Sequence, residues 1–176
     1  MDTKNTWALD PTHSELTFKV RHMMISNVKG EFKDFTIDVK GDDLLNSDFQ
    51  ANIATTSVNT NNTDRDNHLR SADFFDSENH PALTFKSTGI TQKEGNEYKL
   101  KGLLSIKGVS KEITLDIEYG GINKDPWGNE KSGISFEGKI NRKDWGLNWN
   151  TALETGGVLV SDEVKLYGEL QFVKQS

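Results

Sequence analysis

Apolar and polar residues alternate cleanly over much of the chain, most regularly where Ile113, Leu115, Ile117 and Tyr119 are separated by polar residues. A period of two residues is typical of a strand that buries one face. The same alternation returns in segments bounded by Gly, Asn, Asp or Pro: Leu16 to Val20, Leu83 to Phe85, Leu100 to Ile106, Ile134 to Ile140 and Val164 to Phe172. The pattern therefore predicts a series of amphipathic strands.

Short turn segments separate successive strands in the second half of the chain, at residues 94–96, 107–110 and 125–129. Antiparallel strands joined by such turns form a meander. The count of alternating runs is about eight, the number at which a closed barrel has room for packed side chains or one small ligand. We therefore predict an all-β, antiparallel, up-and-down barrel of about eight strands, in one domain over residues 1–176.

Three segments depart from the alternation. Over residues 65–75 the apolar residues recur at helical spacing, which predicts one short helix. Residues 22–25 are apolar but too few for a strand, and a single helical turn that caps one end would suit them. Phe32 and Phe35 fall on opposite parities, which predicts a bulge or bend near residues 33–34. The barrel should thus carry one or two short helices.

Three glycines, Gly102, Gly138 and Gly168, fall on the inward parity of their strands. They would let the strands bend as the barrel closes, or leave volume for a guest, and both can hold. A tube with an otherwise apolar wall suits a long apolar molecule better than a compact polar one. We therefore predict a lipid-binding pore formed by these glycines and seven side chains: Phe18, Val20, Phe85, Leu104, Ile117, Phe136 and Leu166.

Composition narrows the function classes. The net charge is -6 and no dense Lys/Arg stretch is present, which argues against nucleic acid as a partner. The chain contains no cysteine, so thiolate nucleophiles, disulfides and Cys-based metal sites are excluded. Its four histidines form no H-x-H or H-E-x-x-H arrangement, and we predict no metal and no cofactor other than a bound lipid.

Catalysis has limited support in the sequence. Arg65, Asp66 and His68 are residue types that serve acid/base chemistry, although an Arg-Asp pair beside a helix start is more often a structural clamp. Arg142 and Asp144 call for the same caution. A small hydrolase or isomerase acting on a lipid-like substrate is therefore the alternative to a binding protein. A third possibility is an interaction module whose barrel is packed solid.

The segment from Trp145 to Trp149 holds two indoles, which would plug one end of the barrel or form a mobile lid over it. We favour the plug, because tryptophans usually contribute buried area. Residues 151–162 have mixed polarity and include Gly156-Gly157, which predicts a long loop before the last strand.

Several motifs, in order over nearly the whole chain, closely resemble the YceI-like polyisoprenoid-binding family. They begin with Trp7-x-Leu9-Asp10-Pro11-x-His13-Ser14, Phe18-x-Val20-x-His22-Met23 and Gly30-x-Phe32. They continue with Ser57-Val58-Asn59-Thr60, Arg65-Asp66-x-His68-Leu69, Phe74-Phe75, Pro81, Phe85-x-Ser87-Thr88, Gly102-x-Leu104, Lys107-Gly108-Val109 and Asn141-Arg142-x-Asp144-Trp145-Gly146. His80 stands where this pattern leads us to expect an aromatic residue before the proline.

The resemblance implies a lipocalin-like barrel whose apolar pore takes an isoprenoid chain or another long lipid, such as a quinone tail or a polyprenyl phosphate. It supplies no catalytic residues. Because basic residues lie next to predicted strand ends and the short helix, we predict that the polar head of the lipid contacts Arg21, His22, Arg65 or His68. The partners expected are thus a long-chain isoprenoid lipid and, as an alternative to a monomer, a second copy of the chain in a homodimer.

Location is predicted from the start of the chain and from its hydropathy. Residues 1–7 lack the basic and apolar regions of a secretory signal, although many members of the family carry one. No apolar run approaches the ~18 residues of a transmembrane helix. We therefore expect a cytoplasmic protein without a transmembrane segment.

Overall fold

The computed structural model describes residues 7–23, 25–41, 43–150 and 160–175. In these residues one antiparallel sheet contains β1 Trp7–Leu9, β2 Glu15–His22, β3 Ser26–Phe32, β4 Phe35–Lys40, β5 Asp48–Ala54, β6 Val58–Asn59, β7 Ala82–Glu94, β8 Glu97–Ile106, β9 Val109–Lys124, β10 Glu130–Asn141 and β11 Val160–Lys174. The helical elements are α1 Thr63–Arg70 and the short 3-10 helices η1 Pro11–His13, η2 Leu44–Asn46, η3 Thr55–Ser57 and η4 Arg142–Trp145.

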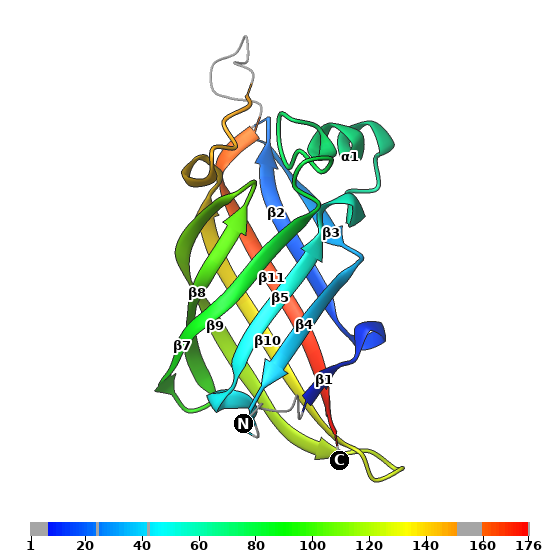
Figure 1. Ribbon diagram of the computed structural model, residues 1–176, viewed down its shortest axis with the longest axis vertical. Helices are drawn as coiled ribbons and strands as arrows, with labels where there is room; N and C mark the ends of the chain where they lie inside the picture. Colours follow the sequence, from blue (N-terminus) through cyan, green and yellow to red (C-terminus); the bar gives the residue numbers. More distant parts are fainter. Residues whose placement is uncertain (1–6, 24, 42, 151–159, 176) are drawn as a thin grey trace.

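The sheet closes into a barrel (Figure 1). The order β1-β4-β5-β7-β8-β9-β10-β11 returns to β1, because β11 also pairs with β1. β1 and β2 pair with successive parts of β11, so together they occupy one position in the ring. β4 pairs with β1 and β3 pairs with β2, so β3 and β4 together occupy the next position and are separated at residues 33–34. The ring therefore has eight strand positions, which confirms the predicted eight-stranded antiparallel barrel, and the strand is interrupted where we expected a bulge or bend.

Strands β7 to β11 form the predicted meander, each pairing with the next along the chain. The β8–β9 hairpin has a two-residue turn in which Lys107 and Gly108 both take positive φ, 53° and 80°. Two positive φ values are typical of the type I′ turn, whose twist matches that of the flanking strands. The sequence analysis placed this hairpin correctly.

Two local predictions are wrong. Helix α1 begins after Asn62, whose side chain accepts a hydrogen bond from Arg65 N (3.0 Å), and ends at Arg70 rather than at residue 75. Beyond it the chain folds back in turns, with Phe75 N donating to Leu69 O (2.9 Å). Of the helical turn predicted over residues 22–25, residue 24 lies outside the described residues; His22 belongs to β2 and Met23 has a left-handed φ of 54°, so the described part is not a right-handed helical turn.

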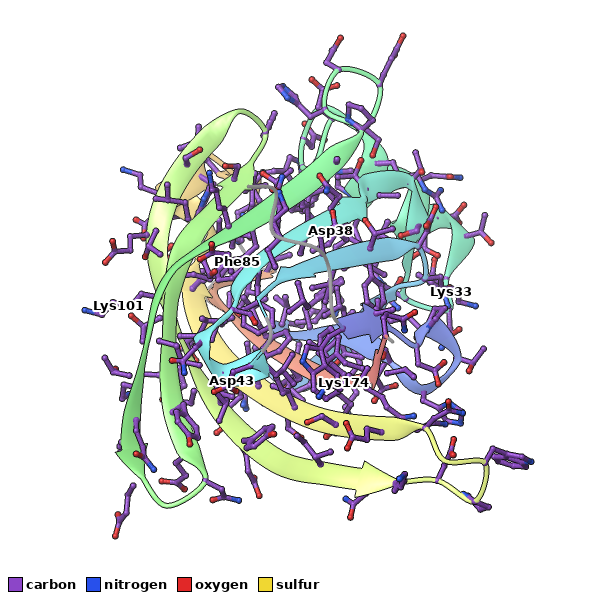
Figure 2. All side chains as sticks on the ribbon, turned by 60° about the horizontal axis from the view of Figure 1, so that its bottom comes forward. Lys33, Asp38, Asp43, Phe85, Lys101 and Lys174 are labelled. Atoms are coloured by element: carbon purple, nitrogen blue, oxygen red, sulfur yellow. The ribbon has the colours of Figure 1, made fainter. Side chains whose placement is uncertain are left out.

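The two ends of the barrel differ. At the end where η2 lies, at the bottom of Figure 1, Trp7, Val39, Leu44 and Phe172 are at most 2% exposed and close the interior. Helix α1, η4 and the β2–β3 turn surround the opposite end. Between them the side chains that fill the barrel are mostly hydrocarbon, whereas Lys33 and Lys101 extend from the outer surface (Figure 2). We call these the closed end and the open end.

Candidate functional site: an apolar cavity with a polar rim

A cavity of about 530 Å³ lies inside the barrel. Its wall is built mostly from apolar side chains of β2 to β5 and β7 to β11, and most of its polar groups lie at the open end. Its volume is within the range of small-molecule sites in proteins. All seven side chains predicted to form the pore lie in this wall: Phe18, Val20, Phe85, Leu104, Ile117, Phe136 and Leu166.

The cavity leaves part of the inner wall uncovered. Phe136, Ile140 and Val164 lie on the inward side of their strands and line the cavity, yet they are only half-buried. At the closed end, Val39 and Phe172 are completely buried. The interior is thus packed at one end and hollow toward the other, which contradicts an interaction module with a solid barrel.

The three inward glycines do not face this cavity themselves. At each, a neighbouring side chain occupies the space in which a Cβ would lie: Phe85 over Gly102, Phe136 over Gly168 and Leu115 over Gly138. None of these glycines belongs to the cavity wall. The prediction that these glycines themselves line the pore is wrong, because a cross-strand side chain covers each of them.

Thr60 joins helix α1 to the barrel at the open end. The Asp66 carboxylate is buried, and its Oδ1 accepts from Thr60 N (2.8 Å) and Thr60 Oγ1 (2.6 Å). Arg65 donates from Nε to Thr60 Oγ1 (2.8 Å) and from Nη2 to Thr60 O (3.1 Å). Both residues therefore fix the helix start to the preceding loop, as the clamp interpretation of the Arg-Asp pair predicts.

An aromatic cluster stands beside this clamp. The imidazole of His68 packs edge-to-face against two rings. Its centroid is 4.4 Å from that of Trp149 and 5.1 Å from that of Phe74. His68 Nε2 lies 2.9 Å from Asp73 Oδ2, so that the carboxylate orients the imidazole. All three rings line the cavity.

Arg142 organises the other side of the rim. Its guanidinium is 3% exposed and donates from Nε to Ser161 O (2.9 Å) and from Nη1 to Trp149 O (2.9 Å), besides the carbonyls of Leu147 and Val160. Burial lowers the pKa of Arg142, and the nearby charge of Asp162 opposes this shift. One side chain therefore connects η4, the segment after it and the start of β11.

Comparison with known proteins identifies the family of this barrel. The model of the YceI-like domain matches residues 7–172. The chain belongs to the YceI-like family. A UPF0312 protein of Staphylococcus epidermidis is 43% identical over 166 residues, which cover 93% of this chain and 94% of the relative.

Solved structures agree with this YceI-like assignment. The Campylobacter jejuni YceI protein is 37% identical, with a TM-score of 0.77 over 89% of this chain and 90% of that protein. A polyisoprenoid binding domain from Saccharophagus degradans shares the fold at 17% identity, with a TM-score of 0.71 over 98% of this chain and all of that domain. In the described part of the chain, no helix is long and apolar enough to cross a membrane.

Of the four basic residues predicted to contact a polar head, three lie at the rim of the YceI-like cavity: His22, Arg65 and His68. Arg21 does not line it, because it lies on the opposite parity of β2 from the inward Val20 and His22. The prediction for Arg21 is therefore wrong. Thr60 and Trp149, which the sequence analysis did not single out as head-group contacts, also stand at the rim.

The residues of the catalytic alternative are not assembled into one centre. Asp66 is buried against Thr60, while the carboxylate beside His68 is that of Asp73. Arg65 is itself held by Thr60. Helix α1 of the YceI-like chain thus carries all three residues, but Arg65 and Asp66 both bond to Thr60, whereas His68 is beside Asp73.

The two indoles at the open end have different surroundings. Trp145 is 2% exposed, and its Nε1 donates to Leu104 O (2.8 Å), so this indole contributes buried area, as the plug interpretation assumed, rather than forming a lid. Trp149 is half-buried beside His68. Of the predicted loop over residues 151–162, residues 151–159 lie outside the described residues, and residues 160–162 belong to β11.

Proposed function

We propose that this protein binds a long-chain isoprenoid-type lipid in the barrel cavity, and sequesters or transports it in the cytoplasm as non-covalent cargo rather than as a substrate. The observation that carries the proposal is the shape of the cavity: an apolar interior, blocked by packed side chains at one end and rimmed by polar groups at the other. A molecule with an apolar tail and one polar end matches this distribution. The YceI-like family and the polyisoprenoid binding domain with the same fold support this ligand class.

Apolar burial would drive binding. Each Å² of apolar surface removed from water contributes about 25 cal/mol, on both the tail and the wall. The half-buried Phe136, Val164 and Leu166 offer such surface to a guest. Affinity should accordingly depend on the tail more than on the head, and a ligand without a tail should bind weakly.

The polar head would remain at the rim. His22, Arg65 and His68 lie there. Arg65 also donates to Thr60 and His68 lies beside Asp73, so these partners hold the two side chains at the rim, whereas the guanidinium of Arg142 is directed to backbone carbonyls. The rim also includes the exposed carboxylate of Asp64. Head-group contacts by the first three residues are part of this proposal.

The test combines ligand identification with a variant that fills the cavity. Native mass spectrometry and solvent extraction of the purified protein should identify a bound isoprenoid, and the delipidated protein should take up an added polyprenyl lipid. Val164→Trp places an indole in the cavity, whereas Lys165→Trp, one residue further along β11, places it on the other face of the strand.

We expect Val164→Trp to weaken uptake by at least about tenfold, which corresponds to 1.4 kcal/mol, and Lys165→Trp to bind as the wild type does. A wild-type protein that takes up no polyprenyl lipid would refute the proposal, as would a folded Val164→Trp variant with unchanged affinity. Turnover of the added lipid would favour the hydrolase or isomerase instead.

A further inference from the structure

Three phenylalanine rings of the cavity wall lie where a glycine has no side chain. A Cβ built on Gly168 would stand 2.0 Å from Phe136 Cε1, and one on Gly30 would stand 2.2 Å from Phe18 Cζ. On Gly102 it would stand 2.4 Å from Phe85 Cζ. Real Cβ atoms do not approach other heavy atoms so closely, so each ring occupies a recess that only glycine provides.

The strand register explains the recesses. Phe18 is directly opposite Gly30 in the β2–β3 pair, and Phe136 is directly opposite Gly168 in the β10–β11 pair. Phe85 is paired with Leu104, two residues from Gly102 on the same face of β8. Cross-strand neighbours at these positions lie within reach of an aromatic side chain. Each ring can therefore lie flat along the barrel wall over the adjacent strand.

We infer that Gly30, Gly102 and Gly168 set the bore of the cavity by holding the rings of Phe18, Phe85 and Phe136 against the wall, and that the resulting width selects a methyl-branched hydrocarbon chain over a straight one. The inference rests on the proposed function and names the feature of the ligand that the wall recognises. The three recesses belong to different strand pairs, so they widen the barrel from several sides. Figure 2 shows Phe85 among the interior side chains, while Lys101, next to Gly102, extends outward.

Adding a methyl group at a recess would reduce this width. The ring cannot move outward, because the backbone of the neighbouring strand lies behind it, and the space available to it is the cavity that it already lines. An alanine at residue 168 would therefore push Phe136 inward. A straight chain tolerates a narrower bore than a chain that carries a methyl branch on each isoprene unit.

The experiment compares two hydrocarbons of equal carbon number, one straight and one regularly methyl-branched, in competition with a fluorescent apolar probe. We expect Gly168→Ala and Gly30→Ala to weaken binding of the branched hydrocarbon by at least about tenfold relative to the straight one, since a methylene in an apolar pocket is worth roughly 10- to 200-fold. Combining Gly168→Ala with Phe136→Leu should restore the wild-type ratio. Gly133→Ala, on β10 with its nearest atom 3.9 Å away, is the matched control and should leave the ratio unchanged.

Equal weakening of both hydrocarbons, or an unchanged ratio in a folded Gly168→Ala variant, would overturn the inference. If Gly168→Ala does not fold, Gly30→Ala decides, because the three atoms nearest to its Cβ belong to a different ring, that of Phe18. A wild-type protein that binds branched hydrocarbons but no polyprenyl lipid would refute the proposed function and leave the bore inference standing. A wild type that binds neither would refute both.

Discussion

At the closed end of the barrel Trp7, Leu44 and Phe172 are at most 2% exposed, whereas at the open end His68 and Trp149 remain half-buried around the cavity. The closed end is held by apolar packing, a non-directional interaction proportional to buried area. The open end is held by hydrogen bonds from a few polar side chains to loop backbone, which fix positions more than they bury surface. The barrel thus separates the region that stabilises the fold from the region that would admit a ligand.

The largest expected effect is at the closed end. Phe172→Ala removes a ring with no exposed surface, packed edge-to-face with Phe49 at a centroid distance of 6.3 Å. Such a change costs about 3–5 kcal/mol, because the lost burial is accompanied by a new cavity. Urea denaturation should show this loss in the free energy of unfolding.

The same substitution at a cavity wall gives the matched comparison. Phe136 is only half-buried, so its ring already lacks neighbours on the side facing the cavity. Phe136→Ala should therefore cost only about 1–2 kcal/mol, a part of the transfer term for a buried ring. Equal losses for the two variants would show that the two ends do not divide stability and access as we describe.

A loss between those of Phe172→Ala and Phe136→Ala is expected at Arg142, which organises one side of the rim. Arg142→Met leaves the carbonyls of Ser161, Trp149 and Val160 without this donor. We expect a loss of about 3 kcal/mol, the upper end of the cost of a buried polar group left unpaired. Arg142→Lys retains the charge but not the planar set of donors, and should recover less than half of the loss in thermal denaturation. Full recovery by lysine would mean that charge alone holds the rim.

The fold was predictable where the chemistry is periodic. Alternation and turn residues gave the eight strand positions and the meander, because a strand with one buried face must repeat every second residue. The end of α1 was misjudged because Leu69 and Phe75, though at helical spacing, are joined by a backbone hydrogen bond that reverses the chain. Periodicity alone cannot distinguish a second helical turn from such a reversal.

The site was likewise predictable only in the part that follows from strand periodicity. The wall residues follow from parity, but the fate of the inward glycines depends on which side chain lies opposite them, and that requires the register. The contacts of Arg142 reach the segment after η4 and the start of β11, up to nineteen residues away in sequence. Its motif was visible in the sequence, whereas its acceptors are backbone carbonyls that carry no sequence signal.

The clamp under α1 should have an intermediate effect confined to the open end. Asp66→Ala removes the carboxylate that binds Thr60 N and Oγ1, and hydrogen bonds to a charged group contribute about 1.5–3 kcal/mol. Amide hydrogen exchange in α1 should accelerate while that of β1 and β11 at the closed end is unchanged. Asp64→Ala, on the same helix but exposed, is the control and should change exchange little. If amide exchange in Asp66→Ala accelerated equally over the whole barrel, the two ends would not be stabilised independently.

The smallest effect concerns pH and the closed half of the barrel, where Asp10 caps η1 and its backbone N–H binds Gln171 O. Hydrogen bonds from the side chains of Thr12 (2.8 Å) and then His13 (2.8 Å) lower the pKa of Asp10 below its ordinary 3.8. Because the folded-state pKa lies below that of the unfolded chain, this carboxylate stabilises the fold above pH 3.8 and its contribution is lost as the pH falls through the folded-state pKa. Asp10→Asn should therefore flatten the acid limb of stability measured by urea denaturation, and Thr12→Val should flatten it partly. If the free energy of unfolding of Asp10→Asn fell at low pH as steeply as that of the wild type, other carboxylates would be responsible for the acid sensitivity. Low pH would then not weaken the closed half selectively.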